Sequence, residues 1–258
     1  MIGDKSIKNF PWISKDNIGI PNAIARSSLF TVEKLDSSHL PVRGLVVYAQ
    51  GSIKISYTGI PLTQFDLNVW LHLVKIASEL QNFSFEISER ELLIRLKITF
   101  GGTQSEHLRE VIHKIASGLI AINDDFKSAH FINSYGRNPV SKKWEFTLNP
   151  DTASLFDPGS WSTVNWLIRD EVRSSSLASW LHAYCSTHKS PVFPIGIDKL
   201  RLMSGSKCST KEFKRVLGNA ATKIEVAAKK HDNEFYFKIE NGIFSAAHGF
   251  QNKKKKTK

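Results

Sequence analysis

Lysines and arginines are concentrated between positions 199 and 230. Their positive charges and N–H donors make them the side chains of this sequence best suited to bind a ligand, in particular an anionic one. Nine of them occur there against two acidic residues, Glu212 and Glu225, which gives the stretch a formal charge of 9 − 2 = +7. Cationic side chains on an exposed helix pair with the phosphates and base edges of a DNA major groove. The stretch therefore predicts a helix that binds DNA.

Helical spacing divides this stretch into two faces, of which the apolar one consists of Phe213, Val216, Leu217, Ala220 and Ile224. On the opposite face, arginine can donate two hydrogen bonds to guanine, asparagine can do so to adenine, and lysine and threonine reach phosphates. Hydroxyls and free N–H groups at the helix start could also hold a phosphate. The predicted contacts are Lys207, Ser209, Thr210, Lys211, Lys214, Arg215, Asn219 and Thr222. An ordinary solvent-exposed helix is the alternative that the residues leave open.

A second and less basic helix is predicted in the first half of the chain, with apolar residues at 108, 111, 112, 115 and 119. Its polar side includes Glu106 and Glu110, which would repel phosphates, so base reading and a protein-contact role both stay open. Cations also gather on the hairpin tip that follows and could straddle a DNA backbone. The predicted contacts of this half are Arg109, His113, Lys114, Arg137, Lys142 and Lys143.

Patterns typical of catalysis are missing from the sequence. No HExxH, GxxxxGK[ST] or GxSxG motif occurs, and no His-x-His pair that could hold a metal beside a nucleophilic tyrosine. We therefore expect no cofactor, no bound metal and no enzymatic activity.

Composition agrees with a polyanionic partner. The 258 residues carry a formal net charge of +11, and the pI is about 9.6. No apolar run approaches a membrane span, and the first residues lack the apolar core of a signal peptide. Two cysteines without CxxC spacing, Cys185 and Cys208, are typical of a reducing compartment. We expect a cytoplasmic protein with no membrane partner.

The order of the expected elements identifies the fold class. Strands are predicted near 45–48 and 53–57, a helix capped by Thr63, a strand at 83–87, and a helix from Ser88 to about 96. The less basic helix described above comes next. Two strands follow it, at 128–133 and 142–148, and a long loop at 134–141 joins them. Helix, helix, turn, helix and hairpin is the winged-helix order.

The same order recurs in the second half. A helix through Trp180 precedes a short helix that Asp198 would cap and Gly205 would end. The basic helix follows, and then a hairpin around Asn241-Gly242, the strongest short hairpin signal. We therefore predict an α+β protein made of two tandem winged-helix domains. The domains are residues 26–165 and 166–250, after an arm lying over the surface at 1–25 and before a disordered lysine-rich tail at 251–258.

Several strings resemble the TrfA-type plasmid replication initiators. They are Pro21-Asn22-Ala-Ile-Ala-Arg26-Ser27-Ser-Leu29-Phe30, Ser56-Tyr57-Thr58-Gly59, Leu62-Thr63-Gln64-Phe-Asp66-Leu-Asn-Val69-Trp70, Leu200-Arg-Leu-Met-Ser204-Gly205-Ser206 and Lys211-Glu212-Phe213-Lys214-Arg215. The resemblance keeps the motif order over roughly residues 10 to 248, and this chain departs from it in its short arm and its lysine tail.

This resemblance implies an initiator that binds direct repeats, called iterons, in double-stranded DNA at the plasmid origin. It also implies melting of an AT-rich segment, recruitment of the host replication initiator, the replicative helicase and the sliding clamp, and an exchange between inactive dimers and DNA-binding monomers. Other readings are a tandem winged-helix transcriptional regulator, a nicking enzyme, or a structural protein that uses winged helices for protein contact. Direct repeats beside the gene would favour the initiator, and a promoter palindrome would favour the regulator.

Overall fold

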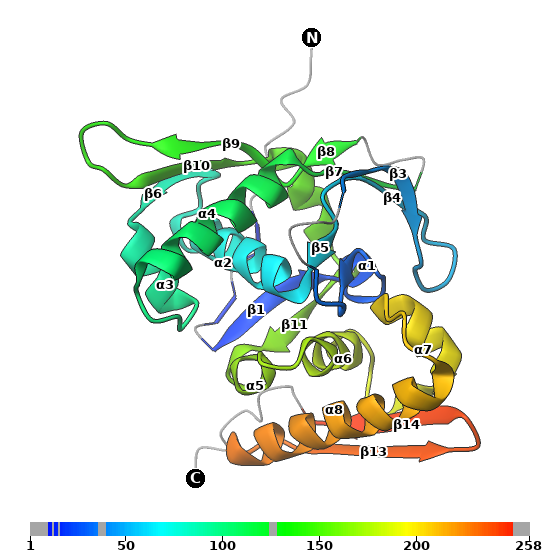
Figure 1. Cartoon of the computed structure of the whole chain (residues 1–258). Coiled ribbons are helices and arrows are strands. Elements are labelled where there is room, and N and C mark those ends of the chain that lie inside the picture. Colours follow the sequence, from blue (N-terminus) through cyan, green and yellow to red (C-terminus); the bar gives the residue numbers. More distant parts are fainter. Residues whose placement is uncertain (1–9, 12, 15, 36–39, 124–127, 250–258) are drawn as a thin grey trace.

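The computed structural model describes residues 10–11, 13–14, 16–35, 40–123 and 128–249. The predicted tail at 251–258 lies outside these residues. The fold is α+β and consists of two winged-helix units, as predicted. Figure 1 shows the first unit above the second, with the two in contact along α2, α5 and α6.

The first winged-helix unit starts at α2 (Gln64–Leu80) and continues through β6 (Ser84–Ile87), α3 (Glu89–Arg95) and α4 (Gly102–Ser117). Its wing is the antiparallel hairpin of β9 (Ile132–Arg137) and β10 (Trp144–Leu148). The sheet has the order β6-β10-β9, so the last strand lies in the middle.

The second unit repeats this arrangement strand for strand. It contains α6 (Ser176–Ser186), β12 (Val192–Gly196), α7 (Ile197–Ser204), α8 (Thr210–Lys230), β13 (Phe235–Glu240) and β14 (Ile243–His248), and its sheet order is β12-β14-β13. Asn241 and Gly242 both have positive φ at the hairpin turn, as the Asn-Gly pair predicts. The tandem architecture expected from the sequence is therefore present.

Further strands surround the first unit. A four-stranded antiparallel sheet has the order β3 (Val42–Val47), β4 (Ile55–Gly59), β7 (Leu119–Ile122) and β8 (Ala129–His130). β2 (Phe30–Thr31) pairs in parallel with β5 (Leu62–Thr63), directly before α2. Leu119, predicted on the helix before it, belongs to β7, because Gly118 with ψ 133° ends α4 in an extended conformation.

The predicted arm at 1–25 does not lie over the surface where it is described. All residues of β1 (Asn17–Pro21) are buried, and the strand pairs antiparallel with β11 (Trp161–Asn165). The short helix α1 (Asn22–Ala25) buries Ile24 and Ala25. The prediction of a surface arm was wrong. Ile18 and Ile20 alternate as in a strand, but this short pattern lies among Pro, Asn and Gly residues, which are typical of loops.

Side-chain caps set the helix ends that position the candidate interface. Thr63 and Asp66 form a reciprocal capping box at the start of α2. Ser209 caps α8, and its Oγ accepts from the Glu212 N–H at 3.3 Å. Gly205 ends α7 in the left-handed region at φ +73°, as predicted. Asp198 does not cap α7: the residue at that position is Gly196, and the Asp198 carboxylate accepts from the Thr210 hydroxyl instead.

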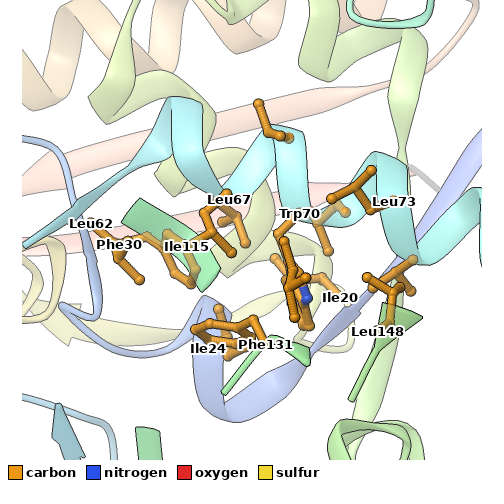
Figure 2. Packing of buried hydrophobic residues seen from close by; sticks show 14 of the residues in the cluster. Ile20, Ile24, Phe30, Leu62, Leu67, Trp70, Leu73, Ile115, Phe131 and Leu148 are labelled. Atoms are coloured by element: carbon orange, nitrogen blue, oxygen red, sulfur yellow. The ribbon is translucent and has the colours of Figure 1, made fainter. Parts of the chain in front are cut away.

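Two hydrophobic clusters form the core. The first runs from Phe10 to Val164 with Ala183, and the second from Ile168 to Ala246. In Figure 2, Trp70 of α2 lies against Phe131, and their ring centroids are 4.8 Å apart. The predicted domain boundary falls between the clusters, where β11 ends and α5 (Trp166–Val172) begins. The 3-10 helix η1 (Pro150–Phe156) covers the first cluster beside β1 and β8.

One buried cation connects the two units. The guanidinium of Arg169 on α5 donates to the Ser179 carbonyl at 2.8 Å and to Asn68 Oδ1 at 2.8 Å and Gln64 Oε1 at 3.2 Å on α2. Burial lowers the pKa of Arg169 to about 10, although the charge of Asp170 opposes the shift. A buried cation without its hydrogen-bond acceptors would destabilise the fold, so this contact holds α2 and α5 in one arrangement.

A second junction lies between β2 and the turn that joins α7 to α8. The Val32 N–H donates to the Ser204 carbonyl at 3.0 Å, the Thr31 hydroxyl to the Gly205 carbonyl at 3.1 Å, and the Lys207 N–H to Glu33 Oε1 at 2.8 Å. The first unit therefore holds the turn that precedes α8.

Candidate nucleic-acid interface

Helix α8 presents the cationic face that the sequence predicts. Phe213, Leu217, Ala220, Ala221 and Ile224 are buried against the second core. The opposite side is open to solvent because the apolar stripe occupies only one side of the helix. The exposed candidates on the helix are Thr210, Lys211, Lys214, Arg215, Asn219 and Thr222, and Lys207 and Ser209 are exposed just before or at its start.

Arg215 already has a carboxylate partner on its own helix. Its Nε lies 3.0 Å from Glu212 Oε2, and its second terminal nitrogen contacts Glu212 Oε1. The hydrogen bonds that Arg215 donates to the Glu212 carboxylate lower the pKa of Glu212 and raise the pKa of Arg215. Exposed pairs of this kind are weak, so a guanine or a phosphate could replace the carboxylate.

The three residues at the start of α8 are engaged within the protein. Ser209 caps the helix, Thr210 donates to Asp198, and the Lys207 N–H donates to Glu33. The ammonium of Lys207 and those of Lys211 and Lys214 have no ion-pair partner among the described residues. These three lysines are therefore the cations of this end of α8 that are free to meet phosphates.

Helix α4 and the first wing share one carboxylate. Glu89, at the start of α3, accepts from Arg109 of α4 at 3.1 Å and from Arg137 of β9. Burial raises the pKa of Glu89, but hydrogen bonds from Ser105 and Arg109 and the charges of both arginines outweigh burial and hold the pKa below its ordinary value. Arg137 also lies over the Trp144 ring, 5.6 Å from its centroid.

Lys114 does not belong to the exposed cationic surface. Its Nζ lies 2.5 Å from Asp66 Oδ2, and the side chains of Lys114 and Asp66 are only 16% and 1% exposed. Because Asp66 also caps α2, the ammonium is part of the structure that fixes α4 against α2. The prediction that Lys114 contacts DNA is corrected on this ground.

The remaining candidates of the first unit stay exposed. His113 Nδ1 lies 2.8 Å from the Tyr135 hydroxyl, which connects α4 to the wing. Lys142 and Lys143 lie in the β9–β10 turn, where Lys142 adopts φ +60°. The hairpin tip is thus cationic, as predicted, although β9 extends to Arg137 and shortens the expected loop.

The α5–α6 turn at residues 173–175 lies between the two candidate helices, with a cleft on either side. A cleft of about 500 Å³ on one side of the turn is lined by Gln104 of α4, Lys97, Arg173, Ser174 and Ser176. A cleft of about 370 Å³ on the other side is lined by Ser175, Leu177 and, on α8, by Asn219 and Lys223. In Figure 1, α4 crosses the upper unit, α8 runs along the lower edge, and α5 and α6 lie between them.

Sequence reasoning did not single out the cations of this intermediate region. Lys97 has φ +52°, and its Nζ lies 2.6 Å from Asp170 Oδ2. Arg173 is exposed, and its Nη1 donates to the carbonyls of Leu96 and Lys97 at 3.0 and 2.9 Å. No local pattern marks either residue, because their position follows from the packing of α3 against α5.

The described part of the chain lacks two other kinds of site. It contains no group of three or more His, Cys, Asp or Glu residues that could hold a metal ion. None of its helices has the length and apolar character that crossing a membrane requires.

Comparison with known proteins identifies the fold. Two crystal structures of domains 2 and 3 of RctB superpose with TM-scores of 0.58 and 0.53, at 9% and 11% sequence identity. They cover 88% and 84% of this chain, and 97% and 95% of the RctB chains. A crystal structure of Pi initiator protein in complex with iteron DNA has a TM-score of 0.49 and 15% identity, over 66% of this chain and 82% of that chain. No protein-family model and no curated protein matches the sequence.

Proposed function

We propose that this chain is a replication initiator that binds direct repeats in double-stranded DNA, with α8 as its main reading helix. The observation that carries the proposal is the exposed face of α8, on which Lys211, Lys214, Arg215 and Asn219 stand opposite the buried apolar residues Phe213, Leu217, Ala220 and Ile224. A helix with this distribution in a winged-helix unit can enter a major groove and contact both bases and phosphates.

The tandem fold supports a site with two DNA-binding heads, one in each winged-helix unit, whose reading helices are α4 and α8. The fixed contacts at Arg169 and at the α7–α8 turn set the distance between α4 and α8. Two heads on successive major-groove faces would occupy about two helical turns, or about 20 base pairs. In this proposal Arg109, His113 and Arg137, with Lys142 and Lys143, contact the backbone from the first unit.

The finer parts of the proposal rest on the resemblance to TrfA-type initiators. The repeats would be iterons of a plasmid origin in the bacterial cytoplasm, and binding would promote origin opening. The host replication initiator, the replicative helicase and the sliding clamp would be recruited there, and a monomer–dimer equilibrium would control the DNA-binding form. The protein would act without catalysis, cofactor or metal.

Footprinting on DNA that flanks the gene tests the proposal. We expect protection over direct repeats of about 20 base pairs, each covered by one copy of the protein. Protection of a single promoter palindrome would instead identify a transcriptional regulator. Metal-dependent strand cleavage in the same reaction would contradict the non-enzymatic proposal.

A further inference from the structure

The α5–α6 turn lies between two clefts, one lined by α4 and the other by α8. Gln104 of α4 lines the cleft on one side of the turn together with Ser174 and Ser176. Asn219 and Lys223 of α8 line the cleft on the other side together with Ser175. A DNA duplex that meets both helices would therefore pass close to this turn.

The guanidinium of Arg173 is held in a fixed orientation at this turn. Both hydrogen bonds of its Nη1 go to backbone carbonyls at the C-terminal end of α3, those of Leu96 and Lys97. An arginine has five N–H donors. With two engaged, 5 − 2 = 3 donors, on Nε and Nη2, have no partner among the described residues.

Charge distinguishes Arg173 from the three arginines predicted to contact DNA. Arg109 and Arg137 share Glu89, and Arg215 pairs with Glu212. Arg173 makes no ion pair within the described residues, and it bonds only to neutral carbonyls. Its positive charge is thus neither neutralised by a carboxylate nor free to move away, which is the arrangement that favours an incoming anion.

The surroundings of Arg173 fit a phosphodiester rather than a base edge. Lys97 adds a second cation, and its partner Asp170 is the acid that lines the same cleft. The exposed hydroxyl of Ser174 and the half-buried hydroxyl of Ser176 are donors of the kind that bind phosphate oxygens.

We propose that the α5–α6 turn is a third DNA contact, in which Arg173, assisted by Ser174, binds a backbone phosphate between the two reading helices. This inference rests on the proposed function, because it assumes that the duplex crosses both helices. The contact carries no sequence information, so it fixes the register of the duplex between the two heads.

Two variants and two matched controls test the contact in the full-length protein. Arg173→Gln removes the charge, and Ser174→Asp places a carboxylate beside an intact Arg173. Arg43→Gln and Ser52→Asp make the same charge changes at exposed positions near the β3–β4 hairpin. Affinity is measured against salt concentration on a random duplex of about 40 base pairs, long enough for both heads, and on the protected repeat.

Both turn variants should bind either duplex about five- to ten-fold more weakly, as expected for the loss of a charge-assisted hydrogen bond. The slope of log affinity against log salt should become shallower by about 0.9 for Arg173→Gln. The controls should keep the parent values. Phosphate ethylation between the two protected groove segments should interfere with binding of the parent protein and no longer with that of Arg173→Gln.

The outcomes separate this inference from the proposed function. If the parent protein protects direct repeats but both turn variants behave like their controls, the turn is not a contact and the proposed function stands. If the parent protein binds neither duplex, both are overturned. A loss in Arg173→Gln alone, with Ser174→Asp unchanged, assigns Arg173 to supporting α3 and also contradicts the phosphate contact.

Discussion

Two arginines of the first unit share a carboxylate that the sequence does not place next to them. Arg109 and Arg137 come from α4 and β9, and both reach Glu89 at the start of α3. In the proposed function, each of these two arginines would have two states, one bound to Glu89 and one bound to a phosphate. DNA affinity would then depend on the free-energy difference between these states rather than on the number of cations.

Glu89→Gln should raise the affinity for DNA. The substitution removes the charge that competes with phosphates for Arg109 and Arg137 while it keeps a side chain of the same shape. We expect about a three- to ten-fold gain in affinity for random and cognate duplexes. The slope of log affinity against log salt should become steeper by the equivalent of about one or two additional phosphate contacts. Titration by fluorescence anisotropy measures both. Glu145→Gln on the exposed side of β10 is the matched control, and an equal gain there would contradict a specific role of Glu89.

Arg215→Ala tests base reading by α8. If its guanidinium leaves Glu212 for a guanine, the substitution should cost about 1–3 kcal/mol at the cognate repeat and relax specificity at one position. Competition with repeats substituted at single positions measures this. An equal loss on cognate and random DNA would show that α8 contacts only the backbone.

At the scale of elements, the sequence predicted those whose signals are local. The Thr63 cap, the Gly205 terminus and the Asn241-Gly242 hairpin depend on residues that are neighbours in the chain, and all three are present. β1 and β12 were missed because their partners are distant: Asn17 pairs with Asn165, and Val192 with Ala246. Pairing over such separations leaves no local pattern apart from short apolar alternation.

The same limit applies to the candidate site. The amphipathic pattern of α8 predicted which of its side chains are exposed, because helix periodicity fixes the two faces. It could not reveal that Lys114 is paired with Asp66, 48 residues earlier (114 − 66), or that Arg173 is held by the end of α3. Those facts follow from tertiary packing alone.

Gly205→Ala should destabilise the second unit and weaken its link to β2. Gly205 has φ +73°, and an added Cβ would come within 2.6 Å of the Thr31 hydroxyl oxygen. We expect a loss of about 1–3 kcal/mol in the free energy of unfolding, measured by urea denaturation. Gly196→Ala, where an added Cβ meets nothing within 4 Å and φ is −63°, is the control. A similar loss in the control would show that the strain at Gly205 is not the cause.

At the scale of the whole molecule, buried histidines make stability depend on pH. Burial, helped by the charges of Lys75 and Arg95 and opposed by hydrogen bonds to the backbone, lowers the pKa of His72 to about 4. Burial also lowers the pKa of His182, His188 and His248. All four groups favour the neutral form in the folded chain.

The free energy of unfolding should therefore fall as the pH drops from about 6.5 towards 4, because the unfolded chain then binds protons that the folded chain does not. His72 alone accounts for at most about 3 kcal/mol of this loss. Above pH 7 none of the four groups contributes a slope. Urea denaturation across this range measures it, with His72→Leu flattening the dependence and the exposed His107→Leu leaving it unchanged.

The pairing of β1 with β11 decides when the first unit can fold during synthesis. The strand made first waits for a partner 148 residues later (165 − 17), so the first core cannot close until residue 165 has left the ribosome. α5 begins at the next residue, and its Arg169 donates hydrogen bonds to Asn68 and to the Ser179 carbonyl. The second unit therefore begins to pack against the first unit as soon as the first core has closed. The order of synthesis thus keeps the first core open until at least 165 of the 258 residues have been translated.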